Sequence, residues 1–344
     1  MITVAVDAEH TRQTSAGTAR ASRALVKALA ARDDVKPIVV GGGPLLERGT
    51  LRKRLTTLHQ DFLWYPARGR RAAIRAGAQV YHCPTPRAPL TRGKLPLVVT
   101  IQDLVPVLFP ETMTPWSRVY TRATFKRVVD AADMIVTPSA DTANDVSRHL
   151  GVREDRLRVV WNGVDPFFFT KPAEPRVAKP YFLFVGTQEP RKNLHRLVEA
   201  VGLLRNRGWE QRLVVAGAGS WGDVQLDSPF IERIGRVSDT ELHSLYAHAD
   251  CLVLPSLHEG FGLPAIEAMA AGTPVVAGAK GALPEVVGNA GVLVDPYDSA
   301  AIANGIEAAI ERRDQLRAAG LARAAQFSWE KAAESMVSVY RELI

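Results

Sequence analysis

The chain has 344 residues, 47% of them hydrophobic, which is enough for two domains with hydrophobic cores. Residues 1–168 carry 25 Lys and Arg against 15 Asp and Glu, whereas the rest of the chain is slightly acidic, so the first half is expected to meet an anionic partner. The two cysteines, Cys83 and Cys251, are far apart and no Cys-x-x-Cys pair exists, which argues against a zinc site or a disulfide framework and favours a reducing cytoplasm.

Short β-branched runs alternate with longer segments of helical period in the first half of the chain. Strands are expected over Ile2–Asp7, Val35–Val40, Val80–His82, Leu97–Ile101, Met134–Thr137 and Leu157–Val160. Helices are expected over Thr18–Arg32 and Ala140–Leu150, the second capped by Ser139. This alternation predicts a parallel sheet that is covered by helices on both faces.

The same alternation resumes after a proline-rich segment. Residues 169–180 contain three prolines and little periodicity, so we predict a linker between a first domain, 1–168, and a second, 181–327. Strands are expected over Tyr181–Val185, Gln211–Ala216, Ile231–Ile234, Cys251–Leu254, Val275–Ala277 and Val292–Val294. Helices are expected over Leu194–Asn206, Asp239–Ala249, Ser299–Arg312 and Gln315–Gln326, with Asp239 as a cap. The predicted fold is α/β, with two doubly wound Rossmann-like domains that bind ligands at the carboxyl ends of their strands.

Basic residues gather in three stretches of the first half, Arg48–Arg54, Arg68–Arg75 and Arg118–Arg127. Any one of them can be an ordinary solvated helix face, but the summed imbalance indicates a phosphorylated acceptor, an anionic membrane surface or nucleic acid. Nucleic acid is disfavoured because zinc-finger spacing and an RNA-binding aromatic signature are absent from the sequence. No stretch approaches the ~18 apolar residues needed to cross a bilayer, and the first residues do not resemble a signal peptide. We therefore expect a cytoplasmic protein, with peripheral contact at most to the inner face of the plasma membrane.

The most informative segment is 258–276, in which Glu259 and Glu267 lie eight residues apart. Glu259 belongs to a glycine-broken loop, and Pro264 suits the first turn of a helix that carries Glu267. Glycines let backbone N–H groups approach a ligand, and ionised carboxylates accept hydrogen bonds from sugar and ribose hydroxyls. From the spacing alone, a surface loop before an amphipathic helix remains an equal alternative.

This segment resembles the Glu-x7-Glu signature of the retaining glycosyltransferases of family GT4 (glycosyltransferase group 1), which have the GT-B fold. Further segments match the family in the same order: Val99–Pro106, Trp161–Asp165, Tyr181–Leu194 and Phe327–Glu330. Val99–Pro106 resembles the acceptor-side His-Asp motif, and Trp161–Asp165 resembles the interdomain Asn-Gly-Val-Asp. Tyr181–Leu194 resembles the donor-phosphate loop, and Phe327–Glu330 resembles the Ser-Trp that opens the last helix. The resemblance implies two parallel sheets that face each other across a cleft, and a C-terminal helix, 328–344, that crosses back to the first domain.

The resemblance also implies a donor site. Arg191 and Lys192 stand between a strand and a helix, where a donor diphosphate would meet both cations. Together with Glu259, which is implied to contact the sugar ring, they are the catalytic candidates, and Glu267 is implied to bind the ribose hydroxyls. Some family members carry an additional Arg at the place of Thr187. Because this chain lacks that arginine, Arg191 and Lys192 are implied to supply more of the positive charge. The other implied donor contacts are Gly17, in the loop 13–18, Gly186, Val237, Gly260, Phe261 and Gly262.

The acceptor side departs from the family at Gln102, where most relatives have a histidine before Asp103. Glutamine forms hydrogen bonds but does not take up a proton near neutral pH, so the site is not expected to depend on an ionisable group there. Asp103 is expected to orient the loop. His82 and His10 lie near other strand ends and are possible substitutes, although each is more often a structural histidine in such a place.

The expected activity is retaining transfer of a hexose from a nucleotide sugar, mannose from GDP-mannose in the first instance, to a hydroxyl of a glycan or a lipid-linked acceptor. The sequence has no Asp-x-Asp triplet, and Arg191 and Lys192 can stabilise the leaving nucleoside diphosphate, so neither a metal nor another cofactor is expected. Two alternatives remain: a nucleotide-sugar epimerase of similar shape, which needs an acid/base pair that Gln102 does not supply, and a non-catalytic nucleotide-sugar-binding protein.

Overall fold

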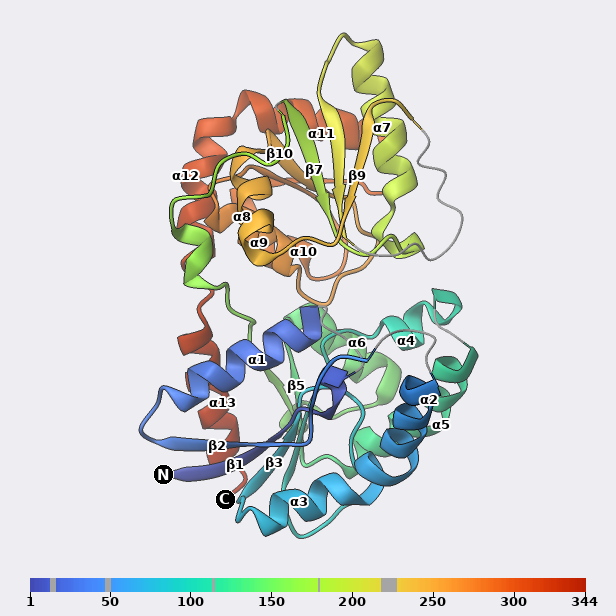
Figure 1. Cartoon of the computed structure of the whole chain (residues 1–344), viewed down its shortest axis with the longest axis vertical. Coiled ribbons are helices and arrows are strands. Elements are labelled where there is room, and N and C mark those ends of the chain that lie inside the picture. The colour runs from blue at the N-terminus through green and yellow to red at the C-terminus, as the bar shows by residue number, and fades with distance from the viewer. Residues whose placement is uncertain (13–16, 47–50, 113–114, 179, 218–227) are drawn as a thin grey trace. The chain divides into compact units, whose positions relative to one another are not determined.

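The chain folds as two compact units, each built around one parallel sheet (Figure 1). The computed structural model describes residues 1–12, 17–46, 51–112, 115–178, 180–217 and 228–344. Unit 1 consists of residues 1–163 and 329–344, and unit 2 of residues 164–328. Helices cover both faces of each sheet, so the predicted α/β class with two Rossmann-like halves is confirmed.

The sheet of unit 1 has the strand order β2-β1-β3-β4-β5-β6, with all neighbours parallel. Its strands are β1 (Ile2–Asp7), β2 (Val35–Val40), β3 (Val80–Cys83), β4 (Leu97–Thr100), β5 (Met134–Thr137) and β6 (Leu157–Val159). Its helices are α1 (Gly17–Ala30), α2 (Leu51–His59), α3 (Gly69–Arg75), α4 (Val105–Leu108), α5 (Pro115–Ala131), α6 (Ala140–Leu150) and α13 (Trp329–Arg341). Between α2 and α3 the chain continues as a π-helical segment, η2 (Gln60–Arg68), and short 3-10 turns are η1 (Glu9–Arg12), η3 (Pro110–Thr112) and η4 (Glu154–Arg156).

The last helix, α13, is part of unit 1 although it follows unit 2 in the sequence. Tyr340 of α13 lies in the interior, where its hydroxyl is 2.8 Å from Nδ1 of His82 on β3. Arg341 pairs with Asp34 at 2.7 Å. A buried aromatic anchor together with a surface ion pair holds this helix on the unit, and the aromatic contributes most because exposed ion pairs are worth little.

The sheet of unit 2 has the order β12-β11-β10-β7-β8-β9, again with all neighbours parallel. Its strands are β7 (Tyr181–Val185), β8 (Arg212–Ala216), β9 (Ile231–Gly235), β10 (Cys251–Leu254), β11 (Val275–Gly278) and β12 (Val292–Val294). Its helices are α7 (Leu194–Asn206), α8 (Asp239–His248), α9 (Leu263–Ala270), α10 (Leu283–Val287), α11 (Ser299–Glu311) and α12 (Arg313–Ala324), and its 3-10 turns are η5 (Pro166–Phe169), η6 (Pro190–Lys192) and η7 (Gly288–Ala290). Strand order reverses direction between β7 and β10, and open α/β sheets bind ligands at such a point.

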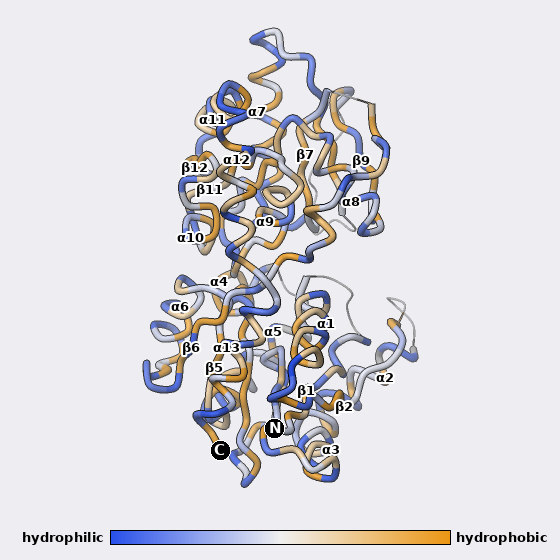
Figure 2. The backbone as a smooth tube through the Cα atoms, turned by 90° about the vertical axis from the view of Figure 1, so that its left-hand side faces the viewer, coloured by the Kyte–Doolittle hydropathy of each residue, from blue (hydrophilic) through white to orange (hydrophobic). Residues whose placement is uncertain are grey.

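Strand β7 illustrates why the strands read as continuous hydrophobic runs (Figure 2). Successive side chains of a strand point to opposite faces of the sheet. Tyr181 and Leu183 belong to one core cluster with helices α8 and α9, whereas Phe182 and Phe184 belong to a second cluster with helices α7 and α11. Because both faces are covered, polar residues have no place in the strand, which is typical of parallel sheets.

Two predicted helix caps have different outcomes. Ser139 caps α6 as predicted, since its hydroxyl accepts a hydrogen bond from the Thr142 amide at 3.1 Å. The prediction that Asp239 caps α8 is wrong. The cap is Ser238, which forms a capping box with Glu241. The Ser-x-x-Glu spacing satisfies two backbone donors at once, which a cap at Asp239 does not achieve.

The proline-rich segment before β7 packs on unit 2, which begins at Val164. Phe168 and Val177 are buried in the same core cluster as Tyr181, and Phe168 lies edge-on to Tyr246 with ring centroids 6.0 Å apart. Residues 164–178 are therefore attached to this unit by apolar contacts. No helix in the described ranges is long and apolar enough to span a bilayer.

Candidate functional site

The charged candidates Arg191, Lys192 and Glu259 of unit 2 lie on the two loops that follow β7 and β10, the strands between which the sheet order reverses. The first loop runs from Gly186 to Asn193 and includes η6, which carries Arg191 and Lys192. The second loop joins β10 to α9 and carries Glu259. A backbone hydrogen bond of 2.8 Å from the Leu257 amide to the Arg191 carbonyl joins the two loops directly.

Glu259 accepts hydrogen bonds from three side chains. Nζ of Lys192 lies 2.5 Å from Oε1, and the Ser256 hydroxyl donates to the same oxygen at 2.7 Å. Nη1 of Arg191 reaches Oε2 at 3.3 Å. The side chains of Lys192 and Glu259 are only 9% and 11% exposed, so this is a buried, hydrogen-bonded ion cluster rather than a surface pair.

The cluster fixes the charge of Glu259. Burial on its own raises the pKa of this carboxyl, but the charges of Lys192 and Arg191 and the hydrogen bonds from Lys192 and Ser256 outweigh it and lower the pKa to about 2. Burial lowers the pKa of Lys192, with Arg191 adding repulsion and Glu259 opposing both. The carboxylate is therefore ionised at every physiological pH, and it offsets part of the positive charge of the two cations.

Glu189 holds Arg191 in place, a role that the sequence analysis missed. Its Oε2 accepts from Nε of Arg191 at 2.9 Å, and its Oε1 accepts from the Thr187 hydroxyl at 2.7 Å. The His258 carbonyl accepts from Nη1 of Arg191 at 3.0 Å. Thr187, which stands where some relatives carry an arginine, thus orients Glu189, and the guanidinium is left with 11% exposure.

Asn193 is the single non-glycine residue with positive φ among the described residues, at φ 60° and ψ 33°. It is fully buried, and Nδ2 donates to the carbonyls of Pro255 at 2.9 Å and Pro296 at 2.5 Å. Oδ1 accepts from Arg196 at 2.9 Å. Asparagine tolerates the left-handed region better than most residues, and here its amide joins the loops that follow β7, β10 and β12.

Replacing Asn193 with glycine is expected to lower the free energy of unfolding by about 2 kcal/mol, because two buried carbonyls lose their donor while the backbone conformation is retained. Replacing it with alanine is expected to cost about 1 kcal/mol more, since alanine is strained at positive φ. Denaturant unfolding of both variants checks this. Wild-type stability of the glycine variant would show that the amide does not hold the loops.

Glu267 lies inside α9 and is buried, with 4% of its surface exposed. The Tyr246 hydroxyl donates to its Oε2 at 3.0 Å. Gly262 precedes the helix at φ 106°, where a Cβ would come within 2.8 Å of Leu283. The Phe261 ring is buried edge-on to Phe327, 5.6 Å between centroids, so only the backbone of Phe261 is available to a ligand.

Glycines end three adjacent strands of unit 2. Gly186, Gly217 and Gly235 follow or close β7, β8 and β9, and all have positive φ. A Cβ on Gly217 would lie 2.0 Å from the Gly186 carbonyl oxygen, so only glycine fits this close approach of two backbones. Val237 follows Gly235 and is half-buried against the core. At these three strand ends the backbone carries no side chain.

The acceptor-side candidates belong to unit 1. Oε1 of Gln102 accepts from Nδ2 of Asn162 at 3.1 Å, and Asp103 accepts from the Val105 amide at 3.1 Å, at the start of α4. Gly17 is exposed and begins α1, whereas residues 13–16 of its loop lie outside the described residues. His82 is fully buried, and its Nε2 lies 2.8 Å from the Thr100 hydroxyl, so with Tyr340 both ring nitrogens already have protein partners.

His10 differs from His82 in having no hydrogen-bond partner among the described residues. It follows β1 in η1 and is 4% exposed, and neither ring nitrogen has a hydrogen-bond partner within the described part of the chain. Burial, aided by the charge of Arg23, lowers the pKa of His10 to about 4, so the ring is neutral at pH 7. A neutral imidazole can donate to a ligand hydroxyl through one nitrogen and accept through the other.

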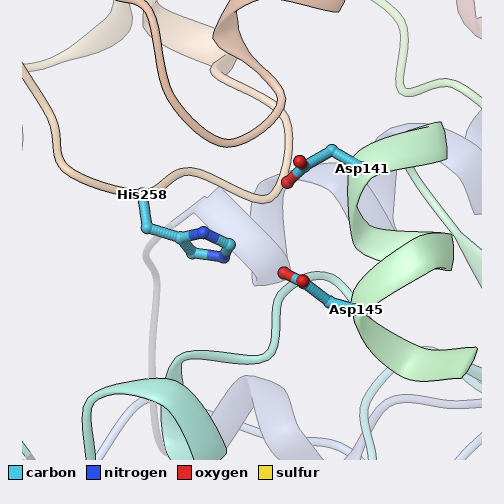
Figure 3. Close-up of side chains that lie close together, drawn as sticks. All are labelled: Asp141, Asp145 and His258. Atoms are coloured by element: carbon cyan, nitrogen blue, oxygen red, sulfur yellow. The ribbon is translucent and has the colours of Figure 1, made fainter. Parts of the chain in front are cut away.

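Within either unit taken alone, the described residues contain no group of three histidine, cysteine or carboxylate side chains placed to hold a metal ion. Asp141 and Asp145 lie one turn apart on α6 of unit 1 (Figure 3). His258, also drawn there, belongs to the loop before α9 of unit 2.

Both halves of the chain match known protein families. Residues 15–167 match the family described as Glycosyltransferase Family 4, and residues 168–326 match Glycosyl transferases group 1. O-antigen chain mannosyltransferase B of Escherichia coli is 32% identical over 315 residues, which cover 85% of this chain and 82% of that protein. MMP alpha-(1->4)-mannosyltransferase of Mycolicibacterium hassiacum is 36% identical over 232 residues, which cover 64% of this chain and 56% of that protein.

Solved structures show the same fold over the whole chain. Sucrose-phosphate synthase from Thermosynechococcus elongatus is 20% identical with a TM-score of 0.73, covering 100% of this chain and 99% of its own. Anabaena Alr3699/HepE, solved in complex with UDP, is 20% identical with a TM-score of 0.70, covering 99% of this chain and 100% of its own. The fold is that of the GT-B glycosyltransferases. The chain belongs to glycosyltransferase family 4, the group 1 glycosyltransferases, as the sequence resemblance predicted.

Proposed function

We propose that this glycosyltransferase transfers a hexose from a nucleotide sugar with retention of anomeric configuration, and that mannose from GDP-mannose is the first donor to test. The observation that carries the proposal is the buried cluster of Lys192, Arg191 and Glu259 on the loops after β7 and β10. Support for mannose comes from the names of relatives, which include O-antigen chain mannosyltransferases of Escherichia coli and Salmonella typhimurium. The acceptor is a hydroxyl of a glycan or of a lipid-linked saccharide.

In the proposed donor complex, the diphosphate lies against Lys192 and Arg191. Charge that develops on the diphosphate as the glycosidic bond breaks is stabilised by these two cations, which the protein already holds in place. Both cations are nearly buried, and electrostatic stabilisation is stronger there than in water. No metal ion is needed for this stabilisation, and the reaction is proposed to be metal-independent.

Glu259 has two roles in this proposal. In the free protein it pairs with Lys192 and Arg191, with Glu189 as the second carboxylate on Arg191, and in the complex it accepts hydrogen bonds from hydroxyls of the transferred sugar. The amides of Gly260, Phe261 and Gly262 follow it and are proposed to contact sugar oxygens. The acceptor hydroxyl attacks on the face from which the diphosphate leaves, and a donor phosphate oxygen takes its proton. Such a step does not require a carboxylate nucleophile.

The nucleoside is proposed to lie on the glycine-lined edge formed by Gly186 and Gly235, beside Val237, with Glu267 bound to the ribose hydroxyls. Support comes from the absence of side chains at these glycines, where the Gly186 and Gly217 backbones approach too closely for a Cβ on Gly217. Gln102 and Asp103 are proposed to face the acceptor, together with the neutral His10. Gly17, at the start of α1, is proposed as a donor contact, as the family resemblance implies. His82 is proposed to support this side from within the unit, because both its ring nitrogens are engaged.

Replacing Glu267 with glutamine is expected to raise the KM for the donor about tenfold with a smaller change in kcat, because a charge-assisted hydrogen bond to the ribose is weakened. Tyr246→Phe, which removes the hydroxyl that orients Glu267, is expected to act in the same direction but less strongly. Steady-state kinetics with a matched donor and acceptor measures both. Full transfer at wild-type KM by Glu267→Gln would count against the ribose assignment.

A screen of nucleotide sugars by thermal shift, followed by NMR of the product, tests the proposal as a whole. A ligand that binds only the folded state raises the melting temperature, so GDP-mannose is expected to raise it more than UDP-glucose does. The product is expected to keep the anomeric configuration of the donor. Isomerised nucleotide sugar formed without acceptor would indicate an epimerase instead.

A further inference from the structure

The helix α2 and its continuation η2 carry an apolar stripe that faces solvent. Leu55, Leu58 and Phe62 are spaced three and four residues apart, which places them on one side of a helix. They are 57%, 46% and 61% exposed. An amphipathic helix of a globular protein normally turns its apolar stripe to the core. Here the stripe is left outside, which indicates a surface that another body covers.

Helix α5 extends this stripe with aromatic and aliphatic side chains. Trp116 is 43% exposed and Val119 is 63% exposed, again three residues apart. The Trp116 ring lies 6.2 Å from that of Phe62, between centroids, and its Nε1 donates to Asp61 at 3.2 Å. These contacts place α5 beside η2. We call Leu55, Leu58, Phe62, Trp116 and Val119 the exposed apolar patch.

Positive charge surrounds the exposed apolar patch. The segment 51–68 has four Arg and Lys against one acid, and α5 likewise has four against one. Both acids are engaged, since Asp61 pairs with Arg87 at 2.8 Å and Asp130 with Lys126 at 2.7 Å. The exposed cations Arg52, Arg118 and Arg122 are therefore not neutralised by these acids. The described part of the basic stretch 48–54, from residue 51 on, lies on α2, and the stretch 118–127 lies on α5.

A hollow of about 480 Å³ adjoins the exposed apolar patch. Leu55 of the patch lines it, and so does the neighbouring Arg52. It opens beside the ends of β1 and β2, where Glu9 and Gly42 lie. Arg12 and His59 also line it, and Trp64 forms an apolar wall. Glu9 is paired with Arg12 at 3.2 Å, so Arg52 gives the hollow its net positive charge. An anionic head group entering it would lie next to side chains suited to lipid.

We propose that the exposed apolar patch and its cations dock unit 1 on an anionic lipid bilayer. Tryptophan and phenylalanine settle at the level of the head groups, and nearby arginines attract the negative surface of the membrane. An interfacial helix binds through this combination of buried apolar area and charge. The inference rests on the proposed function in one respect: it assigns the acceptor to the lipid-linked class, with an anionic group that reaches the hollow beside β1 and β2.

Co-sedimentation of the full-length protein with vesicles tests the docking without any transfer reaction. Vesicles of phosphatidylcholine mixed with phosphatidylglycerol are expected to bind the protein at low salt, whereas pure phosphatidylcholine binds it roughly tenfold less, and high salt weakens binding. The double variant Leu58→Ser, Phe62→Ser is expected to bind anionic vesicles at least tenfold less. Leu203→Ser, which removes a comparably sized, 36% exposed leucine on α7, is the matched control and is expected to bind as wild type does.

Three results would overturn the docking. The first is wild-type protein that transfers sugar to a water-soluble acceptor but does not sediment with anionic vesicles, which would leave the proposed function intact. The second is equal sedimentation of the double variant, provided that its melting temperature equals that of Leu203→Ser. The third is a wild-type dimer in size-exclusion chromatography that the double variant dissociates, because a second copy would then cover the patch. Vesicle binding without sugar transfer would instead support docking and count against the proposed function.

Discussion

Replacing Lys192 with methionine is expected to lower kcat/KM for sugar transfer by roughly 100- to 1,000-fold and the free energy of unfolding by about 3 kcal/mol. The activity falls because the diphosphate loses the nearly buried ammonium that would stabilise its developing charge. The stability falls because Glu259 stays buried with Arg191 as its remaining cation, at 3.3 Å. Kinetics with the donor that the wild type uses and denaturant unfolding measure the two effects.

Lys171→Met is the matched control, because Lys171 is an exposed lysine of the same unit. It is expected to change neither quantity by more than about 0.5 kcal/mol in free energy, as surface substitutions usually do. If Lys192→Met lost stability but kept wild-type kcat/KM, the ion cluster would be a structural element of the loops and not part of the donor site.

Replacing Glu259 with glutamine is expected to separate turnover from product binding. Transfer should fall about 100-fold, because the amide is a weaker acceptor for the sugar hydroxyls than the carboxylate is. The nucleoside diphosphate alone should bind as tightly as to wild type or more tightly, since a negative charge 2.5 Å from Lys192 no longer competes for the cation. Steady-state kinetics measures the expected loss of transfer, and calorimetric titration measures the expected equal or tighter binding of the nucleoside diphosphate. Parallel loss of both would contradict a role of Glu259 toward the sugar.

The pH dependence gives a control for this variant. Because the cations lower the pKa of Glu259 from 4.5 to about 2, the stability that the cluster contributes is complete above pH 4.5 and is lost as the pH falls toward 2. Wild-type transfer is therefore expected not to decline near pH 4.5, so the pH profiles of wild type and Glu259→Gln are expected to agree there. Glu311→Gln, on an exposed carboxylate of α11, is expected to leave activity unchanged at every pH tested.

The strands and the donor-side loops were predictable from the sequence for a clear physical reason. Parallel strands that are buried on both faces are continuous apolar runs, as in Tyr181–Val185 and Cys251–Leu254, and these runs fix where the following loops begin. Arg191, Lys192 and Glu259 follow such runs directly. Their mutual contacts could not be predicted, because the strand order that makes β7 and β10 neighbours is a property of the sheet and not of either segment.

Other parts of the site and fold had no local signal. Glu189 acts on Arg191 within its own loop, whereas Asn193 acts through its positive φ and through carbonyls on other loops, and a single sequence marks neither role. Helices α2 and α5 were missed because Arg and Lys interrupt their apolar residues. Leu55 and Leu58 of α2 and Trp116 and Val119 at the start of α5 are exposed, whereas the later part of α5 packs on the core. The exposed apolar side chains of α2 and of the start of α5 do not form a core-facing pattern in the sequence, and the membrane-docking proposal rests on the same side chains.

Titration calorimetry of GDP and UDP into wild type and Lys192→Met tests the central claim most directly, because it needs neither an acceptor nor turnover. The account predicts that wild type binds one of the two nucleotides at one site and that Lys192→Met binds it at least 100-fold more weakly. Equal affinity of the two proteins for that nucleotide would contradict the claim that the loops after β7 and β10 hold the donor diphosphate.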